Sequence, residues 1–89
     1  MKRILKYSLH SEGIYSVRMP EDGIILSCKL QNGHPCIWVL TENAIVNTTR
    51  HFKAFMTGET IPEGVNMEYI ETLLLNDDRY VIHLFEIKR

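Results

Sequence analysis

The chain has 89 residues, of which 45% are hydrophobic and 24% charged, and its formal net charge is −1. A chain of this length forms one domain, residues 1–89, and its charge balance gives no overall field that would attract nucleic acid or an anionic membrane. It has no apolar run near the roughly 18 residues of a membrane span, and its start, M-K-R-I-L-K-Y, lacks the apolar region of a signal peptide. We therefore expect a cytoplasmic protein that binds neither nucleic acid nor membrane.

Apolar residues recur mainly with a period of two, which predicts short strands and no long amphipathic helix. In chain order, the predicted strands are residues 3–9, 14–19, 24–30, 36–41, 50–57, 69–75 and 80–87. The sequence Pro20-Glu21-Asp22-Gly23 predicts a tight turn before the third strand. Gly58 to Asn66 is a loop with room for one helical turn, and Asn76-Asp77-Asp78 closes the last hairpin. The loop segment Thr57–Gly64 is the candidate ligand-facing segment, because a long loop in a small domain is often functional.

This pattern predicts an all-β fold: a small antiparallel sandwich or partly open barrel of about six to seven strands, with at most one short helical turn. A chain this short leaves edge strands open, so we expect a homo-oligomer that pairs or covers them.

The stretch C-K-L-Q-N-G-H-P-C, residues 28–36, predicts a hairpin with two possible registers. A two-residue Asn32-Gly33 turn places Cys28 and Cys36 on opposite faces. A three-residue loop with a bulge at Gly33 places the two cysteines opposite each other and puts Trp38 on the same face. The second register gathers slightly more apolar residues on one face, and the pattern favours it by a small margin.

The two cysteines are interpreted as buried thiols. A disulfide is not expected in a reducing cytoplasm. His34 and Cys36 invite a zinc interpretation, with Cys28 and a further histidine, but structural zinc usually comes with paired C-x-x-C knuckles, which the sequence lacks. We predict no metal site and no cofactor.

Catalytic motifs are absent from the sequence, so we predict a protein that is not an enzyme. His83 is either a satisfied, partly buried histidine or a hydrogen-bonding group in a pocket. Trp38 is by default a core residue, with a stacking platform as the alternative. Arg50 and Arg79 lie near aromatic residues, where they either line a solvated strand edge or hold an anion.

Read end to end, the chain resembles a family of small proteins encoded by tailed bacteriophages. The resemblance rests on K-Y-S-L, M-P-E-D-G-I-I-L-S, L-Q-N-G-H-P-C-I-W-V-L, R-H-F, T-G-E-T-I-P, Y-I-E-T and V-I-H-L-F-E. The family pattern has a Q-x-G-x-P-x-L-W-A-L hairpin, a G-T-G-x-x-I-P loop, Y-I-G-T and V-F-H-V-F-E. Here Met56 replaces the first glycine of the loop, and Glu71 replaces the glycine of Y-I-G-T.

The resemblance implies a phage accessory protein in the cytoplasm of an infected bacterium. Small proteins of this kind are often inhibitors of host defence, so the leading hypothesis is a non-enzymatic protein that sequesters a small nucleotide-derived immune signal at a subunit interface. A phosphate-bearing ligand needs cationic or N–H donors and an aromatic stack. The candidate ligand-binding residues are Trp38, Arg50, Tyr69, Arg79 and His83. The alternatives are an inhibitor that docks on a host defence protein and a virion or assembly accessory protein.

Overall fold

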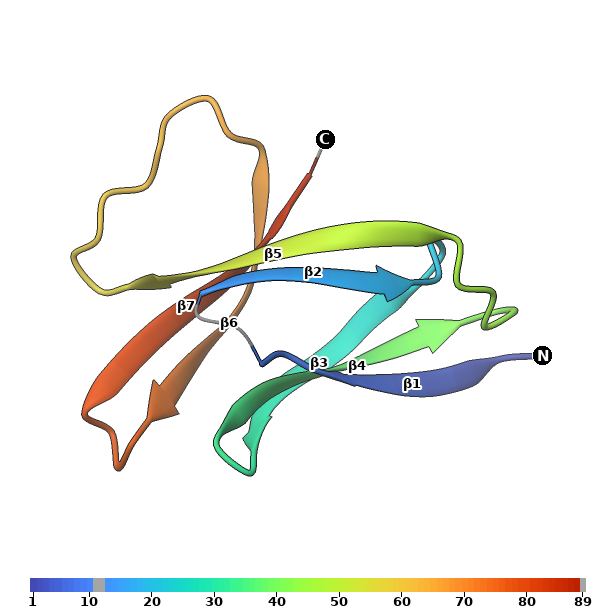
Figure 1. The fold of residues 1–89 in the computed structure, drawn as a ribbon, viewed down its shortest axis with the longest axis horizontal. Coiled ribbons are helices and arrows are strands. Elements are labelled where there is room, and N and C mark those ends of the chain that lie inside the picture. Colours follow the sequence, from blue (N-terminus) through green and yellow to red (C-terminus); the bar gives the residue numbers. More distant parts are fainter. Residues whose placement is uncertain (11–12, 89) are drawn as a thin grey trace.

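The computed structural model describes residues 1–10 and 13–88, and in these ranges the fold is all-β (Figure 1). Seven strands form two antiparallel sheets, which confirms the predicted fold class. The strands are β1 (Arg3–Ser8), β2 (Ile14–Met19), β3 (Ile24–Gln31), β4 (His34–Thr41), β5 (Thr48–Met56), β6 (Met67–Leu75) and β7 (Tyr80–Ile87). One sheet has the order β1-β4-β3 and the other the order β2-β5-β7-β6. The described residues include no helix that could cross a membrane.

The core lies between the two sheets, because alternate side chains of each strand point toward the other sheet. Central strand β4 contributes Ile37 and Val39, and the central strands of the larger sheet contribute Phe52 and Leu84, all with no exposed surface. The core cluster of buried residues is Leu9, Tyr15, Met19, Cys28, Ile37, Val39, Phe52, Leu73, Ile82 and Leu84. The other face of each sheet is left for surface contacts.

The β3–β4 hairpin has the two-residue turn, so the three-residue register that the pattern favoured is wrong. Gln31 pairs with His34, and Asn32 and Gly33 between them both have positive φ. Two consecutive left-handed residues make the turn whose twist matches a hairpin, and Asn-Gly is the sequence that tolerates it best. Cys28 therefore faces the core and Cys36 the outside, and both are buried free thiols.

Trp38 is not a core residue, which corrects the default interpretation. It pairs with Lys6 of β1 and Ser27 of β3, one position out of phase with buried Ile37 and Val39. Its side chain thus lies on the outer face of the three-stranded sheet, where it is half-buried.

Two edge strands that face each other across the sandwich, β3 and β6, each contain a register shift. The shift in β3 lies between Ile25 and Ser27, and the shift in β6 lies between Tyr69 and Glu71. The extra residues increase the local twist of each strand. The two strands line a shared hollow but form no ladder, so the sandwich stays open along this side.

The turn between β2 and β3 has the geometry that its sequence predicts. The Gly23 amide donates to the Pro20 carbonyl at 3.2 Å. Asp22 ties the turn to the end of β4, accepting from the Thr41 hydroxyl at 2.7 Å and the Glu42 amide at 2.9 Å. These hydrogen bonds hold the pKa of the exposed Asp22 carboxyl below its ordinary value.

Candidate ligand-binding site

The outer face of the four-stranded sheet carries cationic, aromatic and hydroxyl side chains. Cross-strand pairing places two rows of outward residues side by side. One row runs Ile14, Lys53, Phe85 and Tyr69 across all four strands, and the next contains Phe55, His83 and Thr72. We call the outward side chains of this sheet the His83 face: Ser16, Arg18, His51, Lys53, Phe55, Tyr69, Thr72, His83 and Phe85.

Three aromatic rings form a continuous group on the His83 face. Phe85 meets Phe55 edge to face, with ring centroids 5.7 Å apart, and it meets Tyr69 in the same way at 5.6 Å. The Lys53 ammonium sits 5.0 Å from the centre of the Phe55 ring, within the range of a cation–π contact. Tyr69 remains 53% exposed, so its ring is open to an incoming planar group.

His83 is held by hydroxyl groups at both ring nitrogens. Its Nε2 lies 2.9 Å from the Thr57 Oγ1 and its Nδ1 lies 3.0 Å from the Thr72 Oγ1. The Tyr69 hydroxyl is 2.6 Å from the same Thr72 Oγ1, which extends the chain to the exposed ring. Because a hydroxyl can donate or accept, both contacts can form with either tautomer of the ring.

The loop after β5 folds against this group and makes a shallow hollow of about 240 Å³. The hollow is lined by Phe55, Met56, Thr57, Gly58, Glu59, Ile61, Tyr69, His83 and Phe85. The loop is anchored at its start, since the Glu59 carboxylate accepts from the Met56 amide at 3.0 Å and the Glu59 amide donates to the Met56 carbonyl at 3.0 Å. The first part of the segment Thr57–Gly64, as far as Ile61, thus lines a hollow beside His83, and its role toward a ligand stays a prediction.

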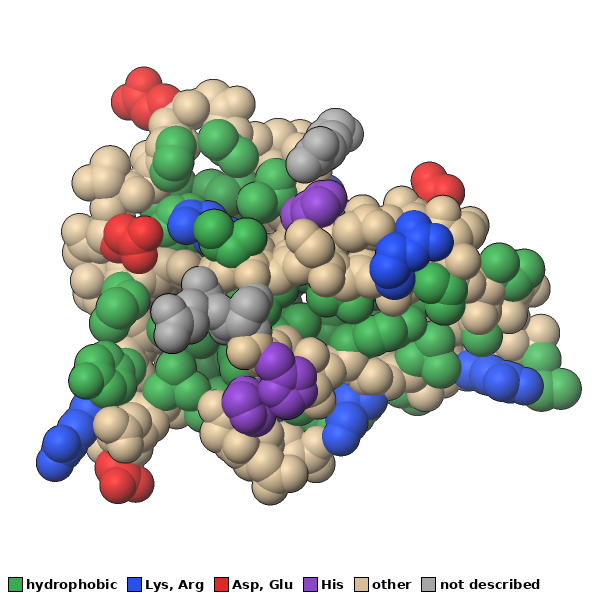
Figure 2. All heavy atoms as spheres, viewed as in Figure 1, with side chains coloured by type: hydrophobic (Ala, Val, Ile, Leu, Met, Phe, Trp, Pro, Cys, Tyr) green, Lys and Arg blue, Asp and Glu red, His purple; other side chains and the backbone are tan. Residues whose placement is uncertain are grey.

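Charges are segregated between the two faces of the four-stranded sheet. Its strands contain only three carboxylates, Glu68, Glu71 and Glu86, and cross-strand pairing places all three on the inner side. Arg18, His51 and Lys53 point outward with His83. In Figure 2, blue and purple side chains lie along the band of β2 and β5, and others lie below it near β1. The strands thus present cations and no carboxylate on the His83 face, and the carboxylate that lines the hollow, Glu59, comes from the loop after β5.

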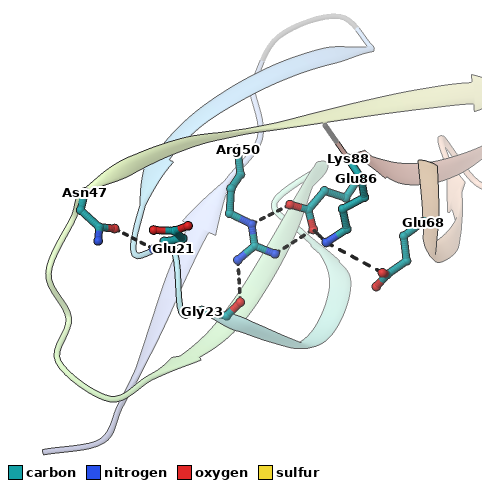
Figure 3. Close-up of polar contacts among 7 residues, drawn as sticks. All are labelled: Glu21, Gly23, Asn47, Arg50, Glu68, Glu86 and Lys88. Carbon is teal, nitrogen blue, oxygen red and sulfur yellow. Dashed lines mark hydrogen bonds and ion pairs between the residues drawn. The ribbon is translucent and has the colours of Figure 1, made fainter. Parts of the chain in front are cut away.

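Arg50 lies on the inner side of the sheet, bound to Glu86 (Figure 3). Its Nε donates to one carboxylate oxygen at 2.6 Å, its Nη2 donates to the other at 2.7 Å, and its Nη1 donates to the Gly23 carbonyl. Lys88 donates to the same carboxylate at 3.1 Å and lies 3.8 Å from Glu68. The guanidinium is thus committed to a buried fork-like pair and not directed at solvent.

The pair shifts the titration of both partners. Burial acts to raise the pKa of Glu86, but the hydrogen bonds and charges of Arg50 and Lys88 together outweigh it, and the net pKa lies below the ordinary value. The hydrogen bond to Glu86 raises the pKa of Arg50 in turn. Both groups are therefore charged at neutral pH.

The five candidate residues from the sequence lie in four places. Tyr69 and His83 share the His83 face. Trp38 is on the other sheet, Arg50 is inside, and Arg79 is in the exposed β6–β7 turn, where its amide donates to the Asn76 carbonyl at 3.1 Å. Only two of the five are brought together.

Lys53 and Arg18 were missed as site residues, although the sequence holds a signal for Lys53. In the predicted strand 50–57, strict alternation puts His51, Lys53 and Phe55 on one face and Phe52 with Ala54 on the other. That rule alone separates outward His51 and Lys53 from inward Arg50. The signal for Arg18 is weaker, because only pairing of β2 with β5 brings it 3.3 Å from the Thr49 hydroxyl.

The arrangement can bind, by stacking and hydrogen bonding, a planar group that carries negative charge. Tyr69 offers a ring face, the Thr57 hydroxyl keeps hydrogen-bonding capacity beyond its contact with His83, and Lys53 supplies a cation beside the hollow. In the described part of the chain, no group of three or more His, Cys, Asp or Glu side chains could hold a metal ion.

Comparison with known proteins places the whole chain in one family. The match covers residues 1–89 and is to the domain of unknown function DUF7352. The protein belongs to the DUF7352 family. No curated protein and no solved structure matches it. For this DUF7352 protein, any proposal about function therefore depends on the site geometry described above.

Proposed function

We propose that this DUF7352 protein is a non-enzymatic binding protein that sequesters a small nucleotide-like ligand on the His83 face. The observation that carries the proposal is the charge segregation of the four-stranded sheet: its outward cations and aromatic rings lie together, and its carboxylates lie on the other side. The resemblance to small phage proteins supports placing that ligand among host immune signals, in the cytoplasm of an infected bacterium.

The chemistry of a nucleotide fits the residues of this face. A base has a planar ring that stacks on Tyr69, and its edge can exchange hydrogen bonds with the Thr57 hydroxyl, which His83 holds in place at 2.9 Å. A phosphate carries the charge that Lys53 complements. The hollow of about 240 Å³ is shallow, so a single chain covers only part of such a ligand. A second copy that covers the exposed side of this hollow would supply the remaining contacts, as in the predicted homo-oligomer.

A binding role is favoured over catalysis by the surroundings of His83. A histidine that acts as a base for a nucleophile is usually oriented by a carboxylate at its other nitrogen. Here the group at Nδ1 is the neutral Thr72 hydroxyl, at 3.0 Å. The Thr57 hydroxyl at Nε2 therefore has no charged partner behind the imidazole to activate it.

The test uses adenosine and adenosine 5′-monophosphate as matched probes, titrated by calorimetry and by native mass spectrometry. We expect the monophosphate to bind more tightly than the nucleoside. Lys53→Gln should weaken the monophosphate selectively, and Tyr69→Ala should weaken both probes. Lys6→Gln, an equivalent change on the other sheet, is the control and should leave both affinities unchanged.

Native mass spectrometry of the protein exposed to extract from phage-infected bacteria extends the test to the natural ligand. We expect a gain of a few hundred daltons that is lost in the Tyr69→Ala variant. Equal binding of the two probes in all variants, together with no gain of mass from the extract, would refute the proposal.

A further inference from the structure

The outer face of the three-stranded sheet carries an apolar patch that the ligand site does not use. Ile4 of β1, Leu40 of β4 and Ile24 of β3 align in one row across the sheet, and Trp38 lies in the next row. Ile4 is 60% exposed and Ile24 is 61% exposed, while Trp38 and Leu40 are half-buried. We call Ile4, Ile24, Trp38 and Leu40 the Trp38 face.

A row of three large apolar side chains with a tryptophan in the next row is more than the scattered exposure that any surface shows. Single exposed apolar residues are normal in folded proteins, whereas contiguous ones mark interaction sites. Tryptophan is also enriched among the residues that contribute most to binding, especially where it is already partly packed. Trp38 has this setting, since it is half-buried between Lys6 of β1 and Ser27 of β3, the latter at the register shift of that strand.

The strands of the Trp38 face carry charge of one sign, and at its margin the Glu42 carboxylate, just beyond β4, is paired with Lys2 at 3.8 Å. Strands β1, β3 and β4 contain no aspartate or glutamate. Lys6 lies next to Trp38 in the same row, and Lys29 lies opposite Cys36 one row further. The Lys6 ammonium donates to the neutral Gln31 amide oxygen at 2.6 Å. Within residues 1–10 and 13–88, neither lysine has a carboxylate within salt-bridge distance.

This charge pattern argues against a second copy as the occupant. A two-fold contact through this face places the same patch on both sides. Lys6 and Lys29 then face strands that carry lysines and no carboxylate, and Glu42 at the margin is already paired with Lys2. Like charges across an interface disfavour association. A partner with acidic groups around an apolar centre complements the face instead.

We propose that the Trp38 face docks a partner protein whose contact surface has an apolar centre and an acidic rim. Trp38, Ile4 and Ile24 bury the apolar centre, and Lys6 and Lys29 face the carboxylates. The site is on the opposite sheet from the His83 face and involves none of its residues, so it stands or falls separately from the proposed function.

The experiment uses the full chain as bait in extract from phage-infected bacteria. The baits are wild type, Lys6→Glu/Lys29→Glu, Ile4→Asp, and Lys53→Glu, the last carrying the same kind of charge reversal on the other sheet. Any captured protein is then purified and titrated against wild type. Trp38 is the only tryptophan in the chain, so its fluorescence reports on this face alone. The titration follows the quenching of that fluorescence by a label on the partner.

We expect a captured protein that is retained by Lys53→Glu and lost by the double lysine variant and by Ile4→Asp. Its affinity should fall at least about tenfold with the double charge reversal, and should weaken as salt is raised. Circular dichroism of each variant establishes that the fold is intact.

Three results would overturn the proposal. They are capture that survives the double charge reversal in a folded variant, the absence of any captured protein, and a wild-type dimer in sedimentation that Ile4→Asp dissociates. The third would assign the face to a second copy, and capture of nucleic acid in place of protein would assign it to a polyanion.

Discussion

At the scale of single residues, Arg50 shows how one side chain can satisfy the rule for a ligand-binding arginine and serve another purpose. Its guanidinium joins three segments, since Glu86 comes from the last strand and Gly23 from the β2–β3 turn. Gly23 has no room for a side chain there, because an added Cβ would lie 2.5 Å from the Val39 Cγ1. The buried pair therefore fixes how the turn packs against the sheet.

Breaking this pair from either end should be costly. Arg50→Met leaves the Glu86 carboxylate buried without its main partner, and Glu86→Gln leaves the guanidinium without its counter-charge. We expect each change to lower the free energy of unfolding by about 3–5 kcal/mol. The double variant Arg50→Met/Glu86→Leu should lose much less, because it removes both charges. Urea denaturation of the four proteins measures this, and additive losses in the double variant would contradict it.

The same pair should make the protein sensitive to acid. The pKa of Glu86 in the folded protein lies below its ordinary value of 4.5. Its contribution to stability is therefore complete above that value and is lost as the pH falls through the folded-state pKa. Compared with wild type, Arg50→Met/Glu86→Leu should lose less stability between pH 5 and the acid limit of folding. Unfolding curves at a series of pH values test this. If the free energy of unfolding fell in parallel for the two proteins, Glu86 would be excluded as a source of the acid sensitivity.

At the scale of elements, the strands follow from the sequence and their pairing does not. All seven predicted strands exist, and 14–19 and 80–87 match in both bounds, because alternation of apolar and polar residues is a local property. The register shifts at Leu26 and Ile70 carry no glycine or proline signal. The Arg50–Glu86 pair joins residues 36 apart, and the His83 face combines β2, β5 and the β6–β7 hairpin. These features depend on packing between distant segments, which one sequence does not display.

The hairpin register can be tested with cysteines. In the observed register, Lys29 is opposite Cys36, while Cys28 points to the other face. The variant Lys29→Cys should therefore form a disulfide with Cys36 under mild oxidation, and wild type should keep both thiols free. Burial raises the pKa of Cys28 to about 11, so this thiol should also react slowly. Thiol titration and peptide mapping provide the measurement, and a Cys28–Cys36 disulfide in the folded wild type would favour the three-residue loop.

At the scale of the whole molecule, two open sheets enclose one core and leave two different outer faces. The His83 face presents cations and aromatic rings, and the Trp38 face is apolar with lysines beside it. The two proposals above use one face each, so one chain has the surfaces to hold a small ligand and a protein at once.

The two-sheet architecture also predicts where the backbone is most protected. Strands β4, β5 and β7 are each paired on both sides, whereas β1, β2, β3 and β6 are edges of their sheets. Amides of the three central strands should therefore exchange most slowly with solvent, and those of the edges should exchange faster through local opening. Hydrogen exchange followed by mass spectrometry can check this. Strong protection of β3 and β6 in dilute solution would instead indicate a partner along their open side.

The strand order also has a consequence for the birth of the chain on the ribosome. The three strands of the smaller sheet lie within residues 3–41. In the larger sheet, β6 pairs only with β7, and Arg50 forms its ion pair only after Glu86 has been synthesised. Until residues 80–87 have emerged, the larger sheet lacks β7, the strand that lies between β5 and β6. The inner surface of the smaller sheet is then incompletely covered. The nascent chain thus spends most of its synthesis with exposed apolar surface, which is the condition that recruits chaperones.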